Sequence, residues 1–150
     1  MSNSTRPVWV LETPEQTKAL GRLLAQRLPS GSILLLSGPL GAGKTSLVQG
    51  LAEGFEIPEL VTSPTFALAQ HYPQGTPQLV HLDLYRLCQP ASAEELFLQE
   101  EENAHAAGAF MAVEWPERLG LDLPDAWRLH LRHHGSGRIA QLTSPKKCMT

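Results

Sequence analysis

The segment from Gly38 to Thr45, with the sequence GPLGAGKT, has the residue types and spacing that most clearly predict chemistry. It matches the pattern G-x-x-x-x-G-K-[ST] at every fixed position, and it lies between an apolar run and an amphipathic helical pattern. Glycines let the backbone curl so that successive N–H groups point at phosphate oxygens, and the helix that follows adds the positive end of its dipole. The predicted ligand is therefore ATP or a close relative.

The residues of this loop have distinct predicted tasks. Lys44 is expected to reach the terminal phosphates and to take part in catalysis, and the Thr45 hydroxyl is expected to be a ligand of Mg²⁺. The residues predicted to bind the nucleotide here are Gly38, Gly41, Ala42, Gly43, Lys44, Thr45 and Ser46.

A hydrolysing site also needs an acidic side chain at the carboxyl end of a neighbouring strand, and two candidates are present. Asp83 ends the apolar run from Leu79, and Glu114 ends the run from Ala109. Either carboxylate could support the metal and order the attacking water, or could be a strand-end carboxylate that meets solvent or an arginine. Spacing alone does not assign the two roles.

Two further segments have both a functional and a structural interpretation. Thr62, Ser63 and Thr65 follow the first nucleotide-binding helix, where P-loop proteins often place a switch-like loop that senses the terminal phosphate. The alternative is a turn that Pro64 stiffens before a strand. Trp115 follows Glu114, and a tryptophan at a strand end serves packing more often than chemistry.

Alternating strand and helix patterns predict an α/β domain of three layers that positions these residues. Strands are expected at 8–11, 33–36, 66–72, 79–84, 109–113, 127–132 and 138–142. Helices are expected from Thr13-Pro14, from Thr45, and from a capping box formed by Ser92 and Glu95. Short connections predict antiparallel hairpins at 73–77 and 135–137, so the central sheet should be mixed and mostly parallel. Residues 1–142 are predicted to form one P-loop NTPase domain, and residues 143–150 a disordered tail.

Composition narrows the class of protein. The chain has 150 residues, 42% of them hydrophobic, and lacks the run of roughly 20 apolar residues that spans a membrane. Its two cysteines have no metal-type spacing, and no signal pattern opens the sequence, so a cytoplasmic location is expected. The formal charge of -3 argues against direct binding of RNA, and the six histidines form no ligand cluster.

Four sequence blocks together resemble the TsaE (YjeE) family of bacterial ATPases, which serve in making threonylcarbamoyladenosine (t6A) in tRNA. The blocks are GPLGAGKT at 38–45, SPTF at 63–66, HLDLYR at 81–86 and VEWPER at 113–118. The last three are more diagnostic than the first, because a P-loop alone identifies only a superfamily.

The resemblance implies that Thr45 and Glu114 bind Mg²⁺, that Asp83 supports hydrolysis, and that Trp115 lies close to the nucleotide. It also implies that a second group of residues lies near the nucleotide, namely Thr13, Pro14 and Arg138. The implied cofactors are ATP and Mg²⁺.

In that family, partner proteins of the TsaB and TsaD type carry out the modification and the ATPase resets or activates their complex. The resemblance therefore implies an ATPase that is slow alone, is stimulated by its partners, and meets tRNA through the complex. Two alternatives come from other classes. A small-molecule kinase would need an arginine-bearing lid, and no clear lid sequence is present; a GTP-dependent binding switch would need N-K-x-D, which the sequence lacks.

Overall fold

The computed structural model describes residues 6–62, 64 and 68–146, and in this part of the chain strands and helices alternate as expected. The elements in chain order are β1 (Val8–Leu11), α1 (Pro14–Arg27), β2 (Ile33–Ser37), α2 (Lys44–Gly54), β3 (Ala69–Tyr72), β4 (Leu79–Asp83), α3 (Pro90–Ala107), β5 (Phe110–Glu114), the 3₁₀ helix η1 (Pro116–Arg118), β6 (Trp127–His134) and β7 (Gly137–Thr143).

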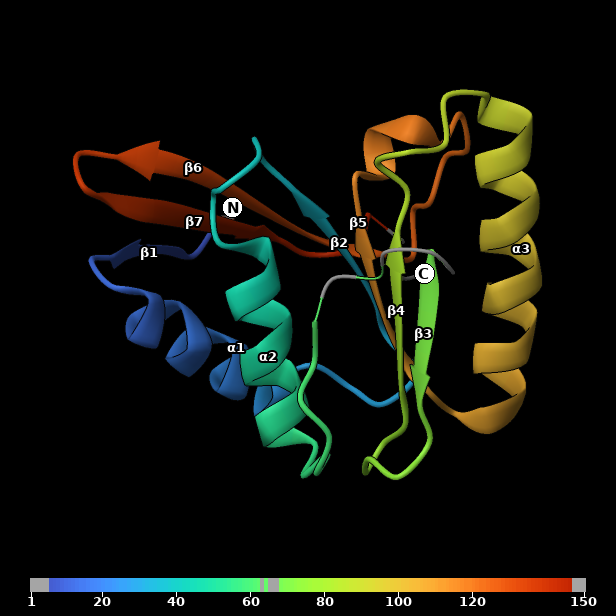
Figure 1. The fold of residues 1–150 in the computed structure, drawn as a ribbon, viewed down its shortest axis with the longest axis horizontal. Helices are drawn as coiled ribbons and strands as arrows, with labels where there is room; N and C mark the ends of the chain where they lie inside the picture. Colours follow the sequence, from blue (N-terminus) through green and yellow to red (C-terminus); the bar gives the residue numbers. More distant parts are fainter. Residues whose placement is uncertain (1–5, 63, 65–67, 147–150) are drawn as a thin grey trace.

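The seven strands form one mixed sheet with the order β1-β7-β6-β2-β5-β4-β3. The four central strands, β6, β2, β5 and β4, are parallel to one another. The hairpins β3–β4 and β6–β7 are antiparallel, and β1 pairs antiparallel with β7 at the edge. Helices α1 and α2 lie against one face of the sheet and α3 lies against the other (Figure 1). The predicted α/β fold class is confirmed.

Parallel strands place their carboxyl ends at one edge of the sheet, and this arrangement creates the site. The chain leaves β2 at this edge, makes the glycine loop and enters α2, while β4 and β5 end beside it (Figure 1). Helices α1 and α2 pack closely because Gly50 lets the backbone of α2 approach Lys18; an added Cβ would overlap the Lys18 carbonyl. No helix in the described residues is long and apolar enough to cross a membrane.

The start of α1 follows the prediction, whereas the start of α3 does not. Thr13 caps α1 by accepting the Gln16 N–H at 3.2 Å, and Pro14 is the first helical residue. The capping box predicted at Ser92 and Glu95 is wrong, because α3 already begins at Pro90. Proline fixes a helical φ at a position where no N–H is needed, so it starts the helix three residues earlier than a cap at Ser92 would.

Three other predicted boundaries need correction or fall outside the described part. The strand expected at 66–72 begins at Ala69, after Leu68 with a positive φ of 60°, and residues 66 and 67 lie outside the described residues. The strand expected at 127–132 is longer, because His133 and His134 are the last residues of β6. The predicted tail overlaps β7, which ends at Thr143, and residues 147–150 lie outside the description.

Candidate nucleotide site

The glycine loop between β2 and α2 has the backbone geometry of a phosphate cradle. Gly38, Gly41 and Gly43 have φ values of 142°, 77° and 100°, a region in which only glycine is free of steric cost. An added Cβ at Gly38 would overlap the carbonyl of Leu131 in β6, so this position also needs glycine for close packing. Gly43 is the N-cap of α2, and no described side chain caps that end, which leaves backbone N–H groups for an anion.

A cavity of about 520 Å³ opens over this loop. Its volume lies within the usual range of about 300–1,000 Å³ for ligand pockets. Of the residues predicted to bind nucleotide or metal or to act in catalysis, those that line the cavity are Thr13, Pro14, Gly41, Gly43, Lys44, Thr45, Ser46, Asp83, Glu114, Trp115 and Arg138.

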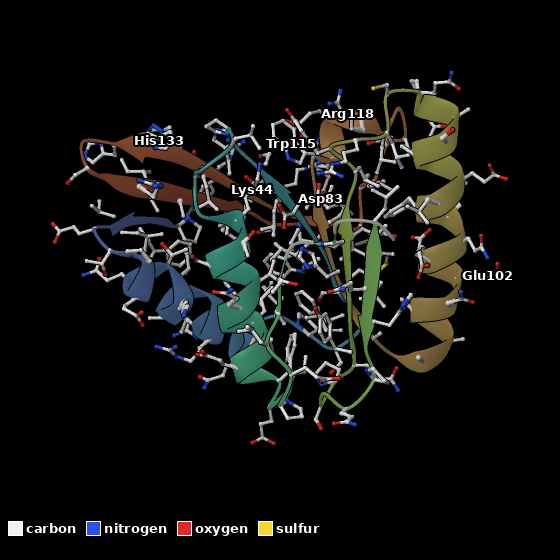
Figure 2. The ribbon with its side chains drawn as sticks, in the orientation of Figure 1. Lys44, Asp83, Glu102, Trp115, Arg118 and His133 are labelled. Carbon is white, nitrogen blue, oxygen red and sulfur yellow. The ribbon has the colours of Figure 1, made fainter. Side chains whose placement is uncertain are left out.

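Lys44 is buried at the base of this cavity. Its Nζ donates to the Gly38 carbonyl at 2.5 Å and lies 3.9 Å from the ring centroid of Trp115 (Figure 2). Burial lowers the pKa of Lys44, while the negative charges of Glu114, Glu117 and Asp83 raise it in opposition. The ammonium is therefore held between a carbonyl dipole and an aromatic face, and phosphate oxygens would be stronger partners for it.

The two predicted carboxylates lie side by side at the ends of β4 and β5, where Asp83 pairs in register with Glu114. Both belong to the sheet face that carries the glycine loop and α2. Burial raises the pKa of Asp83, and the nearby charge of Glu114 raises it further. Three groups lower this pKa in opposition. They are the Tyr85 N–H, which donates to Asp83 Oδ1 at 3.0 Å, and the charges of His81 and Lys44. Asp83 is thus a half-buried acid beside the ammonium of Lys44.

His81 is the partner of Glu114, a role that the sequence analysis did not foresee. Its Nε2 lies 2.7 Å from Glu114 Oε2, and both side chains are buried. Among the described residues, His81 Nδ1 has no hydrogen-bond partner. The pair fixes one carboxylate oxygen of Glu114 and leaves the other for a second interaction.

An alternating stack of cations and aromatic rings closes this side of the cavity. Trp115 has a left-handed backbone with φ 60° and ψ 52°, uncommon for a bulky residue, and this turns its ring toward Lys44. Its ring packs on Tyr85 with centroids 4.8 Å apart. Arg118 in turn donates to the Tyr85 carbonyl at 3.2 and 2.8 Å, so η1 is tied to the segment that follows β4.

The opposite wall comes from the two ends of the chain, which β1 and β7 bring together. Arg138 in β7 pairs with Leu11 in β1, two residues before Thr13. Its Nη2 donates to the Gly41 carbonyl at 2.8 Å and its Nη1 to the Gly137 carbonyl at 2.9 Å. The sheet therefore places Thr13, Pro14 and Arg138 on the rim of one cavity.

Some predicted residues lie elsewhere. Gly38 and Ala42 belong to the glycine loop, but they are buried and do not line the cavity. Thr62 is exposed and away from it, and Ser63 and Thr65 lie outside the described residues, so the switch-like role remains a prediction.

Other residues of the cavity were not predicted as site residues. Lining residues without an assigned role are Leu11, Glu12, Thr17, Leu40, Tyr85, Ser136 and Gly137. Only Tyr85 carried a signal in the sequence, because it follows Asp83 by two positions within the HLDLYR block.

Comparison with known proteins identifies this arrangement. Residues 11–140 match the family model of "Threonylcarbamoyl adenosine biosynthesis protein TsaE". The chain belongs to the TsaE family. Proteins named "tRNA threonylcarbamoyladenosine biosynthesis protein TsaE" are similar to it across much of their length. The one from Nostoc is 46% identical over 73% of this chain and 67% of its own, and the one from Mycobacterium bovis is 42% identical over 84% and 80%.

A solved structure extends the TsaE comparison to the fold. The crystal structure of YdiB from Bacillus subtilis superposes with a TM-score of 0.72 and 28% sequence identity, covering 97% of this chain and 89% of YdiB. The chain therefore has the P-loop NTPase fold of this TsaE-family relative.

Proposed function

We propose that this protein is an ATPase that acts in the t6A modification of tRNA, binding and hydrolysing ATP with Mg²⁺ to drive the cycle of a TsaB/TsaD-type partner complex. The observation that carries the proposal is the convergence of the glycine loop, Lys44, Asp83 and Glu114 on one cavity. Membership of the TsaE family supports the connection to tRNA modification. We also propose a cytoplasmic location, where the partners and tRNA would be available.

The glycine loop would hold the phosphates through its backbone N–H groups and the N-terminal end of α2. Lys44 would exchange the Gly38 carbonyl for phosphate oxygens. Trp115 would keep the ammonium from turning away, because its ring covers Nζ. Thr13, Pro14 and Arg138 would border the remainder of the nucleotide, since they form the far rim of the cavity.

The donors at the site fit a magnesium ion. Mg²⁺ prefers hard oxygen ligands, keeps several waters and needs only one or two carboxylates or hydroxyls besides phosphate oxygens. Thr45 and Glu114 both line the cavity, and Glu114 has one carboxylate oxygen that is not engaged by His81. Mg²⁺, when bound, would offset phosphate charge during transfer.

Asp83 would order and polarise the attacking water. It lies beside Glu114 in the register of the sheet, and its raised pKa makes it a stronger base than an exposed aspartate. No arginine finger is evident in the sequence. Hydrolysis by the protein alone should therefore be slow, on the order of 10⁻⁴ to 10⁻² s⁻¹, as in P-loop proteins that lack an arginine finger.

The test is reconstitution of t6A formation with purified TsaB/TsaD-type proteins, tRNA, a threonylcarbamoyl donor, ATP and Mg²⁺. Repeated turnover should require this protein, and Lys44→Ala should reduce it to the level seen without the protein. ATP hydrolysis should rise when the partners are added. Modification that is equally fast without the protein, or with Lys44→Ala in its place, would contradict the proposal.

A further inference from the structure

The tip of the glycine loop is held by a side chain from a distant part of the sequence. Arg138 Nη2 donates to the Gly41 carbonyl at 2.8 Å, although the two residues are 97 positions apart. Arg138 Nη1 donates to the carbonyl of the preceding residue, Gly137, at 2.9 Å. One guanidinium therefore joins strand β7 to the turn that carries the backbone donors for phosphate.

The composition of the glycine loop allows many backbone conformations. Gly38, Gly41 and Gly43 all have positive φ, and glycine loses more conformational freedom than any other residue when its backbone is fixed. Within the loop the Ala42 N–H donates to the Pro39 carbonyl at 3.2 Å, while Gly41 is exposed at the tip. Contacts from other elements are needed if the N–H groups are to keep one arrangement before a ligand binds.

The strand end of the contact is firmly placed in the sheet. β7 lies between β1 and β6, so Arg138 pairs with Leu11 on one side and with His133 on the other (Figure 1). Gly137 approaches the Leu11 carbonyl so closely that an added Cβ would overlap it. Because the strand is paired on both edges and the loop is rich in glycine, the contact restrains the loop more than the strand.

Two side chains hold carbonyls of the loop, and ATP should affect them differently. Lys44 donates to the Gly38 carbonyl and would leave it for phosphate oxygens. The Gly41 carbonyl is an acceptor and takes no part in binding phosphate, so the bond from Arg138 does not compete with the ligand. A guanidinium has five N–H donors, which lets Arg138 keep both carbonyl contacts while it borders the nucleotide.

We propose that Arg138 is a positioning residue that holds the glycine loop in its phosphate-binding form before ATP arrives. The inference rests on the proposed function, because the restrained loop is the one assigned to the phosphates. Ordering the loop in advance removes part of the entropic cost of binding, which raises affinity without a new contact to the ligand.

Hydrogen exchange in the ligand-free proteins tests the restraint itself, in wild type, Arg138→Ala, Arg138→Lys and Arg132→Ala. Arg132 is the matched control, since it is an exposed arginine of the same hairpin and does not line the nucleotide cavity. Amides of the glycine loop, followed by mass spectrometry, should exchange about tenfold faster in Arg138→Ala and at the wild-type rate in the control. Arg138→Lys should lie between them, because an ammonium keeps the charge but lacks the planar fork that reaches two carbonyls.

Binding measurements on the same four proteins test whether the restraint matters. They are the affinity for ATP by calorimetry and the inhibition constant of tripolyphosphate, which lacks base and ribose. Both should weaken by the same factor, about threefold to tenfold, in Arg138→Ala, by less in Arg138→Lys, and not in the control. Melting temperatures are recorded alongside, and Arg138→Lys carries the comparison if Arg138→Ala folds poorly.

Three results would overturn the inference and leave the proposed function standing. Weaker ATP binding with unchanged exchange of the loop would make Arg138 a direct ligand of the nucleotide. Weaker ATP binding with unchanged inhibition by tripolyphosphate would place its contact on the base or ribose. Faster exchange with unchanged affinity would mean that holding the loop does not aid binding. Failure of wild type to bind ATP would instead contradict the proposed function, and the positioning role would fail with it.

Discussion

The two walls of the cavity are built in different ways. The glycine loop is local: one stretch of chain supplies the turn, the backbone donors, Lys44 and Thr45. The wall beside the loop is assembled from β4, β5 and η1, where His81 meets Glu114 and Arg118 meets Tyr85, each across 33 positions of sequence. We call the second region the acid wall, comprising His81, Asp83, Tyr85, Glu114, Trp115 and Arg118.

Because the two walls are built from different kinds of groups, we expect substitutions in each wall to affect different steps. A loop of backbone donors recognises phosphate whatever reaction follows, so it governs affinity. The acid wall supplies Asp83, whose pKa is raised by burial, and Glu114, whose carboxylate is held in place by His81. Hydrolysis needs a basic carboxylate, and metal binding needs an oriented one. Variants in the loop should therefore reduce binding, and variants in the acid wall should reduce rate or metal dependence.

The largest effect is expected for Asp83→Asn. The substitution removes the base that orders the attacking water but keeps an oxygen that can accept the Tyr85 N–H. Single-turnover hydrolysis should fall by about 10²- to 10⁴-fold, the usual contribution of general acid–base catalysis, while ATP affinity changes by a few-fold at most. Hydrolysis at the wild-type rate would remove Asp83 from the mechanism.

Lys44→Ala should have the next largest effect, and it should act on binding. A hydrogen bond to a charged group contributes about 1.5–3 kcal/mol, so ATP affinity should fall by about 10- to 100-fold in calorimetry. The fold should survive, because burial disfavours the charged lysine and Glu114 keeps His81 as its partner. Wild-type affinity in this variant would disprove the phosphate cradle.

His81 offers a sharper test of how the acid wall is oriented. His81→Leu removes the partner of Glu114, whereas His81→Gln keeps an N–H donor of similar reach. Partners that orient a metal ligand typically affect metal affinity by about 10- to 100-fold. The concentration of Mg²⁺ needed for half-maximal hydrolysis should therefore rise by about tenfold in His81→Leu. It should rise much less in His81→Gln. Equal behaviour of both variants, with melting temperatures unchanged, would mean that His81 only fills space.

The smallest expected effect concerns stability and pH. Because the pKa of Asp83 is raised in the folded protein, the folded state holds this proton at a pH where the unfolded chain has released it. That stabilisation is complete below the unfolded pKa and is lost as pH rises through the folded pKa. Asp83→Asn lacks the titration, so its gain in free energy of unfolding over wild type should be smallest near pH 4 and larger near pH 7. Urea unfolding of the ligand-free proteins measures it, and a gain that shrinks as pH rises would contradict the burial of this carboxyl.

The contrast between the walls also explains what the sequence could reveal. The glycine loop is a contiguous pattern, and the strand ends at Asp83 and Glu114 follow from apolar runs, so their convergence could be predicted. The His81–Glu114 pair depends on the register between β4 and β5, which no local pattern encodes.

Calorimetry of ATP binding, with Mg²⁺ and in EDTA, most directly tests how phosphate binding, metal binding and catalysis are divided between the two walls and within the acid wall. The proteins compared are wild type, Glu114→Gln and Asp83→Asn. Glu114→Gln should lower affinity when Mg²⁺ is present and change it little in EDTA, since the lost charge acts through the metal. Asp83→Asn should keep the metal-dependent affinity of wild type. If Glu114→Gln retains full Mg²⁺-dependent affinity, Glu114 is a structural carboxylate held by His81, and the assignment of the metal to the acid wall is wrong.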